Sequence, residues 1–331
     1  MEQKFLDMPE LNTIRRPVKA EMEEFEKYFA TSIKSTISVL DLITKYILRR
    51  KGKQMRPLFV FLTAKMLGEI SSSTYTAASL IELLHTATLV HDDVVGESYE
   101  RRGVFSINAL WRSKIAVLFG DYLLAKGLLL TVEKGDYELL SIVSDAVKQM
   151  SEGELLQIQK SFSLNLDIET YYEVIRKKTA TLIASCTACG AKSIGADEAV
   201  VKDMYELGIA IGMAFQIKDD LFDYQPRGPI GKPTGNDIKE KKFTLPLLYA
   251  LNQASFSERR RIIHLVKSKS SESSVVGEVI AFVDKHGGLQ FAEEKMLAFR
   301  DEALGILARY PSSEARQSLM DLIDFTVFRT K

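Results

Sequence analysis

Apolar residues recur every three or four positions along most of the 331-residue chain, and the alternating pattern of β-strands is scarce. This periodicity predicts an all-α protein. The expected helices span residues 18 to 49, 55 to 68, 74 to 96, 106 to 131, 136 to 160, 168 to 190, 197 to 224, 243 to 252, 257 to 268, 273 to 285 and 288 to 308. The expected breaks are Gly52, Ser71 to Ser73, Gly103, Gly135 and Gly195.

One long irregular segment, PRGPIGKPTGNDIKEKK, covers residues 226 to 242 and is rich in Gly, Pro and Lys. A loop of this length in a compact protein is usually functional or disordered. No shift in composition divides the chain elsewhere. We therefore expect one domain over residues 1 to 331.

Composition and charge narrow the function classes. Lys plus Arg and Asp plus Glu both number 44, so the chain has no global attraction for nucleic acid or for an anionic membrane. Two cysteines and the absence of a signal peptide predict a cytoplasmic location. Asp121 and Lys126 interrupt the longest apolar run, residues 115 to 132, so we expect no transmembrane segment.

Two acidic turns stand out, HDDVVG at residues 91 to 96 and KDDLFD at residues 218 to 223. Residues four apart on a helix differ by about 40° around its axis, and residues seven apart by about 20°. Gln216, Asp219 and Asp223 therefore share one face. In the first motif, Gly96 stands where an acid one turn after Asp92 would complete the same arrangement.

The surroundings of these acids favour a metal site. The preceding segments, LIELLHTATLV and GIAIGMAFQI, are mostly apolar, which predicts the rim of a cavity. The alternative is two surface turns with capping or solubility roles. Oxygen ligands without His or Cys at metal spacing favour Mg²⁺, which is usually shared between carboxylates and substrate phosphates. The sequence therefore predicts a phosphate ester as the substrate.

Cations suited to phosphate occur at four separate places in the chain. They are Lys53 with Arg56, Arg101 with Arg102, Lys178, and Lys232. Lys178 lies on the apolar stripe formed by Ile175 and Leu182, so it needs a buried anion or a route to water. For any one of these residues alone, a solvated surface charge is an equally good interpretation.

Two other motifs carry less weight. His91 and Asp92 could form the HD pair of a metal-dependent phosphohydrolase, but that fold needs further histidines and the chain has only three others. Cys186 and Cys189 form a CxxC, yet no second cysteine pair or local histidine completes a zinc site. We expect both cysteines to pack in a helix core.

The motifs together resemble one family. In order, over residues 51 to 246, they are GKxxRP, ELLHTATLVHDD, RRG, GDYLL, EGELLQ, KTA, FQIKDDLFD and GKPTGxDIKEKKxTLP. This series resembles the trans-type prenyl diphosphate synthases, and within them the octaprenyl-like bacterial enzymes. The resemblance implies a bundle of mostly antiparallel helices around a central cavity, assembled as a homodimer, with the two aspartate motifs facing each other across it.

The resemblance also implies roles for individual residues. The isopentenyl diphosphate site would comprise Lys53, Arg56, His85 and Arg102. The magnesium ligands would be Asp92 and Asp93 in the first motif and Asp219, Asp220 and Asp223 in the second. The allylic diphosphate would be surrounded by Arg101, Lys178, Thr179, Gln216, Lys232 and Lys242. Those expected to act directly in catalysis are Asp92, Asp93, Arg101, Lys178, Asp219 and Lys232.

The implied chemistry needs no side-chain nucleophile. Mg²⁺ and cationic side chains stabilise the negative charge that develops on the departing diphosphate, so the allylic carbon–oxygen bond can ionise. In the family, the double bond of isopentenyl diphosphate is thought to capture the allylic cation, and a proton is then lost. Apolar walls are expected because water must be kept out.

Chain length should follow from the depth of the apolar tunnel. Ala87 and Thr88 precede Asp92 by five and four residues, where short-chain members of the family carry an aromatic ring. Small residues there predict products longer than farnesyl and geranylgeranyl diphosphate. Leu124 and Leu128 are candidates for the floor of the tunnel.

Two positions depart from the family pattern. Gln54 stands where arginine is usual, and Gly96 replaces the last aspartate of the first DDxxD motif, which predicts weaker metal binding there. Glu97 or Glu100 could reach the metal if the helix frays at Gly96. The alternatives to an active elongating enzyme are a non-catalytic or regulatory subunit and a terpene cyclase. The intact second motif and the retained cations favour the active enzyme.

Overall fold

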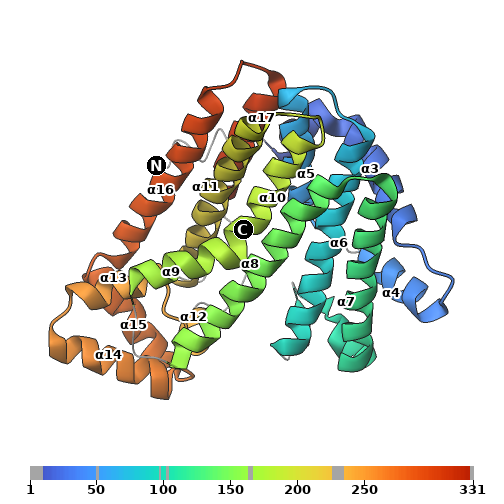
Figure 1. The fold of residues 1–331 in the computed structure, drawn as a ribbon. Coiled ribbons are helices and arrows are strands. Elements are labelled where there is room, and N and C mark those ends of the chain that lie inside the picture. The colour runs from blue at the N-terminus through green and yellow to red at the C-terminus, as the bar shows by residue number, and fades with distance from the viewer. Residues whose placement is uncertain are drawn as a thin grey trace.

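The structure, a computed structural model, describes residues 10–49, 52–96, 98–101, 104–162, 167–225 and 235–328. Nearly all regular structure in these ranges is helical, and Figure 1 shows the long helices side by side. The first half contains α2 (Leu11–Arg15), the 3₁₀ turn η1 (Arg16–Val18), α3 (Lys19–Ser32), α4 (Ser38–Leu48), α5 (Met55–Leu67), α6 (Ser72–Val95), β1 (Glu100–Arg101), β2 (Val104–Phe105), α7 (Ile107–Lys134) and α8 (Tyr137–Phe162). The second half contains α9 (Ile168–Ile175), the π-helical turn η2 (Arg176–Ala180), α10 (Thr181–Lys192), α11 (Glu198–Asp223), α12 (Asn236–Lys239), α13 (Leu245–Gln253), α14 (Phe256–Lys269), α15 (Ser273–Lys285), α16 (Gly288–Ala308) and α17 (Glu314–Phe328).

The all-α fold is confirmed, with specific corrections to the expected elements. The helix expected over residues 18 to 49 is two helices, α3 and α4, because the backbone becomes extended at Ile37. The helix expected over residues 168 to 190 is interrupted by η2. The other expected helices end within three residues of their predicted bounds. The break expected at Gly103 lies outside the described residues.

Three helices and a hairpin were not expected. Helices α2 and α12 have five and four residues, too few for a periodic pattern to show. Helix α17 does carry one, since its buried positions 315, 318, 319, 322 and 323 recur at helical spacing. The hairpin pairs Glu100 with Phe105 and Arg101 with Val104, and two-residue strands leave no readable alternation.

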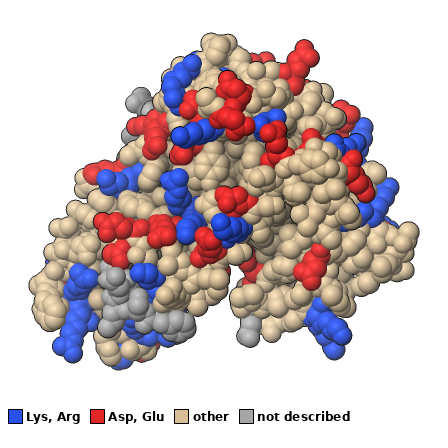
Figure 2. All heavy atoms as spheres, viewed as in Figure 1, with Lys and Arg blue, Asp and Glu red and all other residues tan. Residues whose placement is uncertain are grey.

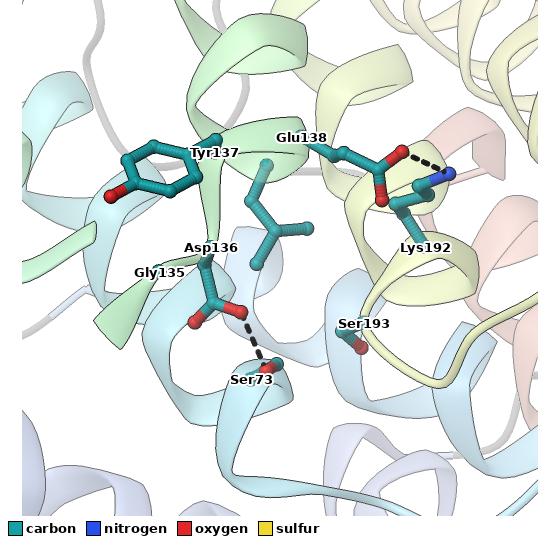
Figure 3. Close-up of a pocket in the computed structure, with 8 residues that line it drawn as sticks. Ser73, Gly135, Asp136, Tyr137, Glu138, Lys192 and Ser193 are labelled. Carbon is teal, nitrogen blue, oxygen red and sulfur yellow. Dashed lines mark hydrogen bonds and ion pairs between the residues drawn. The ribbon is translucent and has the colours of Figure 1, made fainter. Parts of the chain in front are cut away.

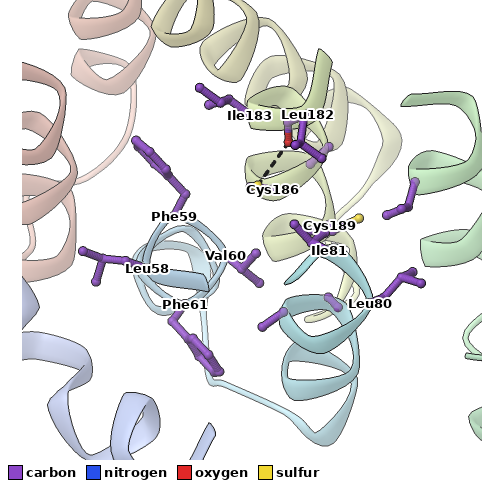
Figure 4. Close-up of a cluster of buried hydrophobic side chains, with 14 of the residues drawn as sticks. Leu58, Phe59, Val60, Phe61, Leu80, Ile81, Leu182, Ile183, Cys186 and Cys189 are labelled. Atoms are coloured by element: carbon purple, nitrogen blue, oxygen red, sulfur yellow. Dashed lines mark hydrogen bonds between the residues drawn. The ribbon is translucent and has the colours of Figure 1, made fainter. Parts of the chain in front are cut away.

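The core is centred on α5 and α10, which are buried along almost their whole length. Residues 57 to 64 of α5 and residues 181 to 191 of α10 are all buried. Figure 4 shows their side chains meeting those of α6, with Cys186 and Cys189 among them. Both cysteines are free and fully buried, so the packing interpretation of the CxxC is confirmed.

Helix α11 approaches η2 and α10 closely because glycines face the contact. A Cβ atom added to Gly208 would lie 2.7 Å from the backbone nitrogen of Ala184, and one added to Gly212 would lie 2.7 Å from the Cβ of Ala180. Backbone atoms cannot move aside at such distances, so these positions need glycine. The small residues of GIAIGMAFQI therefore serve helix packing.

Helices α6 and α11 begin at the same end of the bundle. Ser71, just before α6, donates a hydrogen bond from Oγ to the carbonyl of Ser193, at 2.8 Å. A short loop later, the Asp197 carboxylate accepts from the N–H of Val200 and caps α11. Asp92 follows Ser71 by 21 residues and Asp219 follows Asp197 by 22 residues, which corresponds to roughly 32 Å of helix in each case. Both aspartate motifs are thus carried a similar distance from this end.

Among the described residues, α7 is the one helix long and apolar enough to cross a membrane by length and composition. It packs along α6, and a third of its most apolar window is buried within the bundle. Its outward side carries Leu118, Leu129 and Val132, each about half exposed. A bundle helix with one face in the core and another apolar face outside passes the same test.

Candidate active site

The first aspartate motif lies in the last turn of α6. Gly96 is the C-terminal cap, with φ −85° and ψ 5°, and its N–H donates to the carbonyl of Asp92 at 2.8 Å. Asp92 is exposed, whereas Asp93 is buried. The carbonyl of Asp93 accepts from the N–H of Ser98, at 2.9 Å, and from Asn108 Nδ2, at 3.4 Å. Of the two aspartates, Asp92 is therefore the one whose side chain is open to solvent and ligand.

The end of α6 also bears on the glutamates considered as replacement ligands. The helix stops at Val95 and does not continue to bring a later acid onto the face of Asp92. Glu100 lies in β1 and is exposed. Glu97 lies outside the described residues. A role for either glutamate at the metal stays a prediction.

The second motif lies in the last turn of α11, where Asp219 and Asp223 are half-buried and Asp220 is buried. The Asp223 carboxylate accepts from the backbone N–H of Asn236, at 2.8 Å, and of Asp237, at 2.9 Å. It therefore caps α12 and attaches that short helix to α11, a stabilising position for a negative charge.

Asp220 is the centre of a buried hydrogen-bond network. Tyr171 donates from its hydroxyl to Asp220 Oδ2 at 2.6 Å, and Gln216 donates from Nε2 to Asp220 Oδ1 at 2.9 Å. Gln216 Oε1 in turn accepts from Thr179 Oγ1 at 2.8 Å. The network joins α9, η2 and α11, and it brings together Thr179 and Gln216, two of the residues expected at the allylic diphosphate.

Negative charge accumulates at this end of α11. Burial raises the pKa of Asp220 to about 7, and the negative charges of Asp237 and Asp219 add to the shift while the two hydrogen bonds oppose it. Burial also raises the pKa of Asp237, with Asp223 adding to the shift and Lys242 opposing it. Both motifs sit at helix C-termini, where the helix dipole is negative. A bound cation would relieve this repulsion.

The cation Lys178 lies on η2 and has partners from the EGELLQ motif of α8. Its Nζ is 2.5 Å from Glu154 Oε2 and donates to Gln157 Oε1 at 2.8 Å. A Cβ on Gly153 would lie 2.9 Å from the Lys178 backbone nitrogen, so glycine allows α8 to approach the turn. Lys178 and Glu154 are both partly exposed, so Lys178 has a route to water as well as an anionic partner, and neither charge is buried.

Two residues expected at the isopentenyl diphosphate site flank the start of α5. Lys53 is exposed, and its Nζ lies 5.1 Å from the ring centre of Phe325 on α17. The guanidinium of Arg15 donates to the Lys53 carbonyl, which precedes Gln54 in the left-handed conformation, with φ 47°. Arg56 lies in the first turn of α5 and is partly buried.

The remaining expected residues are placed as follows. His85 lies on α6, seven residues before Asp92, and is partly buried. Lys242 is 2.6 Å from Glu240 Oε2 and 3.4 Å from Asp237 Oδ1. Arg101 contributes its backbone to the hairpin. Arg102 and Lys232 lie outside the described residues.

Four residues near the site were not singled out from the sequence: Arg15, Glu154, Tyr171 and Asp237. Glu154 falls within EGELLQ, so the motif itself contained the signal. Asp237 lies in the segment expected to be a loop and belongs to α12, so no helix spacing within α11 could relate it to Asp223. Arg15 and Tyr171 reach the site only through tertiary contacts, which no local pattern records.

An apolar cavity of about 200 Å³ lies between α6, α7 and α8. Its lining residues are apolar apart from one serine: Leu80, Leu84, Leu123, Leu124, Gly127, Leu128, Leu140, Val143, Ser144 and Val147. Leu84 and Leu80 precede Asp92 by eight and twelve residues on α6, so the cavity lies roughly 12 to 18 Å along the helix from the aspartates. Ala87 lies between Leu84 and Asp92 on α6 and is fully buried. Leu124 and Leu128, the expected floor candidates, both line this cavity.

A second, polar cavity of about 160 Å³ lies at the opposite end of the bundle (Figure 3). Lys192 there pairs with Glu138 at 2.9 Å and Glu198 at 2.7 Å, and Ser73 donates to Asp136 at 2.7 Å. This cavity adjoins the start of α6, and none of its lining residues belongs to either aspartate motif. Figure 2 shows that the surface is hollowed instead between the α6–α7 side and the α12–α15 side.

The carboxylates fit a metal that is shared with a substrate. In the ranges that the structure describes, no group of three or more His, Cys, Asp or Glu side chains could hold an ion by itself. Asp92, Asp219 and Asp223 nevertheless supply hard oxygen donors, and the repulsion among the acids around Asp220 favours a cation. Mg²⁺ commonly completes such an incomplete set with water and substrate phosphates.

Comparisons with known proteins agree with this geometry. The family model described as "Polyprenyl synthetase" matches residues 37–283. The octaprenyl diphosphate synthase of Haemophilus influenzae is 30% identical over 324 residues, covering 98% of both chains. The crystal structure of a decaprenyl diphosphate synthase from Rhodobacter capsulatus superposes with a TM-score of 0.91 at 32% identity, covering 97% of this chain and 100% of that one. A Caulobacter crescentus polyprenyl synthase, complexed with calcium and isoprenyl diphosphate, superposes with a TM-score of 0.89 at 30% identity, covering 98% of this chain and 99% of that one.

The chain therefore belongs to the polyprenyl synthetase family. It is a chain-elongating all-trans prenyltransferase, and isoprenoid diphosphates are its substrate class. The resemblance inferred from the motifs is confirmed, including its octaprenyl-like character. Nothing in the comparisons supports a non-catalytic subunit or a cyclase.

The raised pKa of Asp220 predicts a pH dependence of stability in metal-free protein. Its pKa is about 7 in the folded state and about 3.9 when unfolded. The stabilisation from the protonated carboxyl is fully present below pH 4 and is lost as the pH rises through 7. We expect the unfolding free energy of the wild type to fall relative to Asp220→Asn between pH 4 and pH 8, measured by denaturant unfolding in EDTA. A difference that stays constant across this range would contradict the assignment.

Proposed function

We propose that the protein condenses isopentenyl diphosphate with an allylic primer such as farnesyl diphosphate in a Mg²⁺-dependent reaction that yields a medium- or long-chain polyprenyl diphosphate. The observation that carries this proposal is the apolar cavity lined by Leu80 and Leu84 of α6, two to three helical turns before the turn that bears Asp92. Charged groups at one end and an apolar space beyond them suit a diphosphate with a hydrocarbon chain. The cytoplasmic location remains a prediction.

The allylic diphosphate would lie at the aspartate end. Asp92, Asp219 and Asp223 would hold Mg²⁺ together with the diphosphate oxygens, and the metal supplies stabilisation of the charge that develops on the leaving group. Calcium with isoprenyl diphosphate in the Caulobacter crescentus structure supports a divalent metal on this fold. Lys178, oriented by Glu154, would provide a cation beside the same oxygens.

Isopentenyl diphosphate would lie at the start of α5, where Lys53 and Arg56 supply cations, and His85 of α6 would be a further donor. The ring of Phe325 and the contact from Arg15 hold the Lys53 segment in place. Lys acts as a point charge on phosphate, while Arg can bind two oxygens. Lys53 and Arg56 together could therefore bind the diphosphate of isopentenyl diphosphate without a metal ion.

We propose that the growing chain enters the cavity between α6, α7 and α8. Ala87 is fully buried and carries no bulk beyond its Cβ, and Thr88 turns its hydroxyl to the carbonyl of His85, at 2.9 Å. Neither side chain offers an aromatic barrier between Asp92 and Leu84. This supports products that extend past the C20 length expected of a closed tunnel.

We also propose a homodimer that covers the outward side of α7. Leu118, Leu129 and Val132 lie within about 60° of one another on the helix and are each about half exposed. Monomeric proteins rarely expose a continuous apolar stripe of this kind. A second copy would bury it, and Leu128, which lines the cavity, lies beside the stripe.

The condensation can be tested directly. Wild-type protein incubated with Mg²⁺, farnesyl diphosphate and labelled isopentenyl diphosphate should give all-trans products beyond C20 on chromatography. Gly96→Asp adds a carboxylate one turn after Asp92, and the glycine's φ of −85° accepts any residue, although the new Cβ would lie 3.1 Å from the Asp92 carbonyl. We expect half-maximal activity at lower Mg²⁺ in this variant. An absence of extended product at any Mg²⁺ concentration would refute the proposed reaction.

Filling the cavity should shorten the product. Leu84→Phe places a ring in the apolar cavity two helical turns from Asp92. We expect a shift of the product distribution to shorter chains, because the growing chain meets the ring earlier. The rate of the first condensation should stay within about twofold of the wild type, since the charged end is unchanged. Unaltered product lengths in a folded variant would show that this cavity is not the tunnel.

The homodimer predicts a particular response to charge. Light scattering after size exclusion should give twice the 37.2 kDa mass of the chain for the wild type. Leu129→Glu buries a charge in the proposed interface and should shift the protein to monomer. Phe256→Glu changes an equally apolar, 82% exposed residue on α14 and should leave the dimer intact. Loss of the dimer in both variants, or in neither, would argue against this surface.

A further inference from the structure

Asp220 differs from the other aspartates of its motif. It is 4% exposed, and each of its carboxylate oxygens accepts a hydrogen bond from a protein donor, Tyr171 at 2.6 Å and Gln216 at 2.9 Å. Asp223 also accepts a hydrogen bond on each oxygen, from the backbone of Asn236 and Asp237, but Asp219 and Asp223 are both more exposed than Asp220. A carboxylate buried in this way suits an anchor better than a metal ligand, because almost none of its surface is open to an ion and its substrate.

Tyr171 connects this anchor to the segment that carries Lys178 and Thr179. It lies on α9, which runs without a break into η2, and its side chain is buried. The Tyr171–Asp220 hydrogen bond ties the start of this segment to α11. Eight residues later, the Thr179–Gln216 hydrogen bond ties it to α11 again. The segment between the two ties is therefore held at both ends.

The backbone between these ties is the π-helical turn η2, Arg176–Ala180. A π turn contains one residue more than an α turn and is rarely stable without tertiary contacts. Reversion to regular α-helix would rotate the residues beyond it by about 100°, and Lys178 and Thr179, which lie within the turn, by part of that angle. The direction of these two side chains therefore depends on contacts that hold the turn.

We propose that Tyr171 is a positioning residue for the allylic diphosphate site. Through Asp220 and Gln216 it sets the spacing between the Lys178–Thr179 turn and the aspartates of α11. Asp220 acts in this arrangement as a structural anchor, and Asp219 and Asp223 remain the carboxylates available to a metal. The proposal rests on the proposed allylic site and adds a residue that makes no contact with the substrate.

Two adjacent tyrosines provide a matched test. The Tyr172 hydroxyl is buried with no hydrogen-bond partner among the described residues, so Tyr172→Phe removes an oxygen but no tie. Tyr171→Phe removes the same atom and one tie. We expect Tyr171→Phe to lower kcat/KM for the allylic substrate roughly tenfold or more, as for loss of a hydrogen bond to a charged group, and to raise the Mg²⁺ needed for half-maximal activity. The KM for isopentenyl diphosphate should be unchanged, and Tyr172→Phe should stay within about twofold of the wild type.

A second variant separates this role from general destabilisation. Asp220→Asn removes the charged acceptor of the tie, so adding Tyr171→Phe to it should cause much less than the effect of Tyr171→Phe alone. Equal effects of Tyr171→Phe and Tyr172→Phe would overturn the proposal, as would equal changes in the KM of both substrates or full additivity with Asp220→Asn. A wild type that forms no product would instead refute the proposed condensation, so the two failures are distinguishable.

Discussion

Unfavourable negative charge at two helix ends is the constraint on which the rest of this structure depends. Asp92 and Asp219 lie in the last turns of α6 and α11, where unsatisfied carbonyl groups already make the helix end negative. Burial at Asp220 and Asp237 adds to the cost, as their raised pKa values show. A protein without a cationic ligand gains nothing from this arrangement. Metal ions that bind together with a diphosphate would offset this electrostatic repulsion.

The surrounding structure maintains this charge in a defined place. The Tyr171–Asp220–Gln216–Thr179 network connects α11 to the π turn, and Asp223 attaches α12. Glycines between α10 and α11 allow the close packing that supports the network from behind. Beyond the charged end, α6, α7 and α8 line an apolar cavity with almost no polar side chains. The charged aspartates and the apolar cavity therefore lie at different positions along the same helix, α6.

Much of the fold and part of the site could be predicted from the sequence. The long helices were predictable because their buried faces recur at helical spacing over many turns. Asp219, Asp223 and Gln216 could be grouped because all three lie on one helix. The partners of Lys178 could not be identified, although EGELLQ was visible, because Glu154 and Lys178 lie on different helices. The sequence also could not show that Asp220 is buried while Asp219 and Asp223 are not, since this burial depends on the packing of α9 against α11.

The sequence by itself determined the class of fold, the two acidic turns and the family, because these depend on local spacing and on the order of motifs along the chain. Only the tertiary structure decided which aspartate is buried, which residues orient Lys178, and where the apolar cavity lies relative to Asp92. These properties arise from contacts between segments distant in the chain, such as Tyr171 with Asp220 and Arg15 with Lys53. Burial and hydrogen-bond partners depend on what packs around a residue, and one segment's sequence does not contain that information.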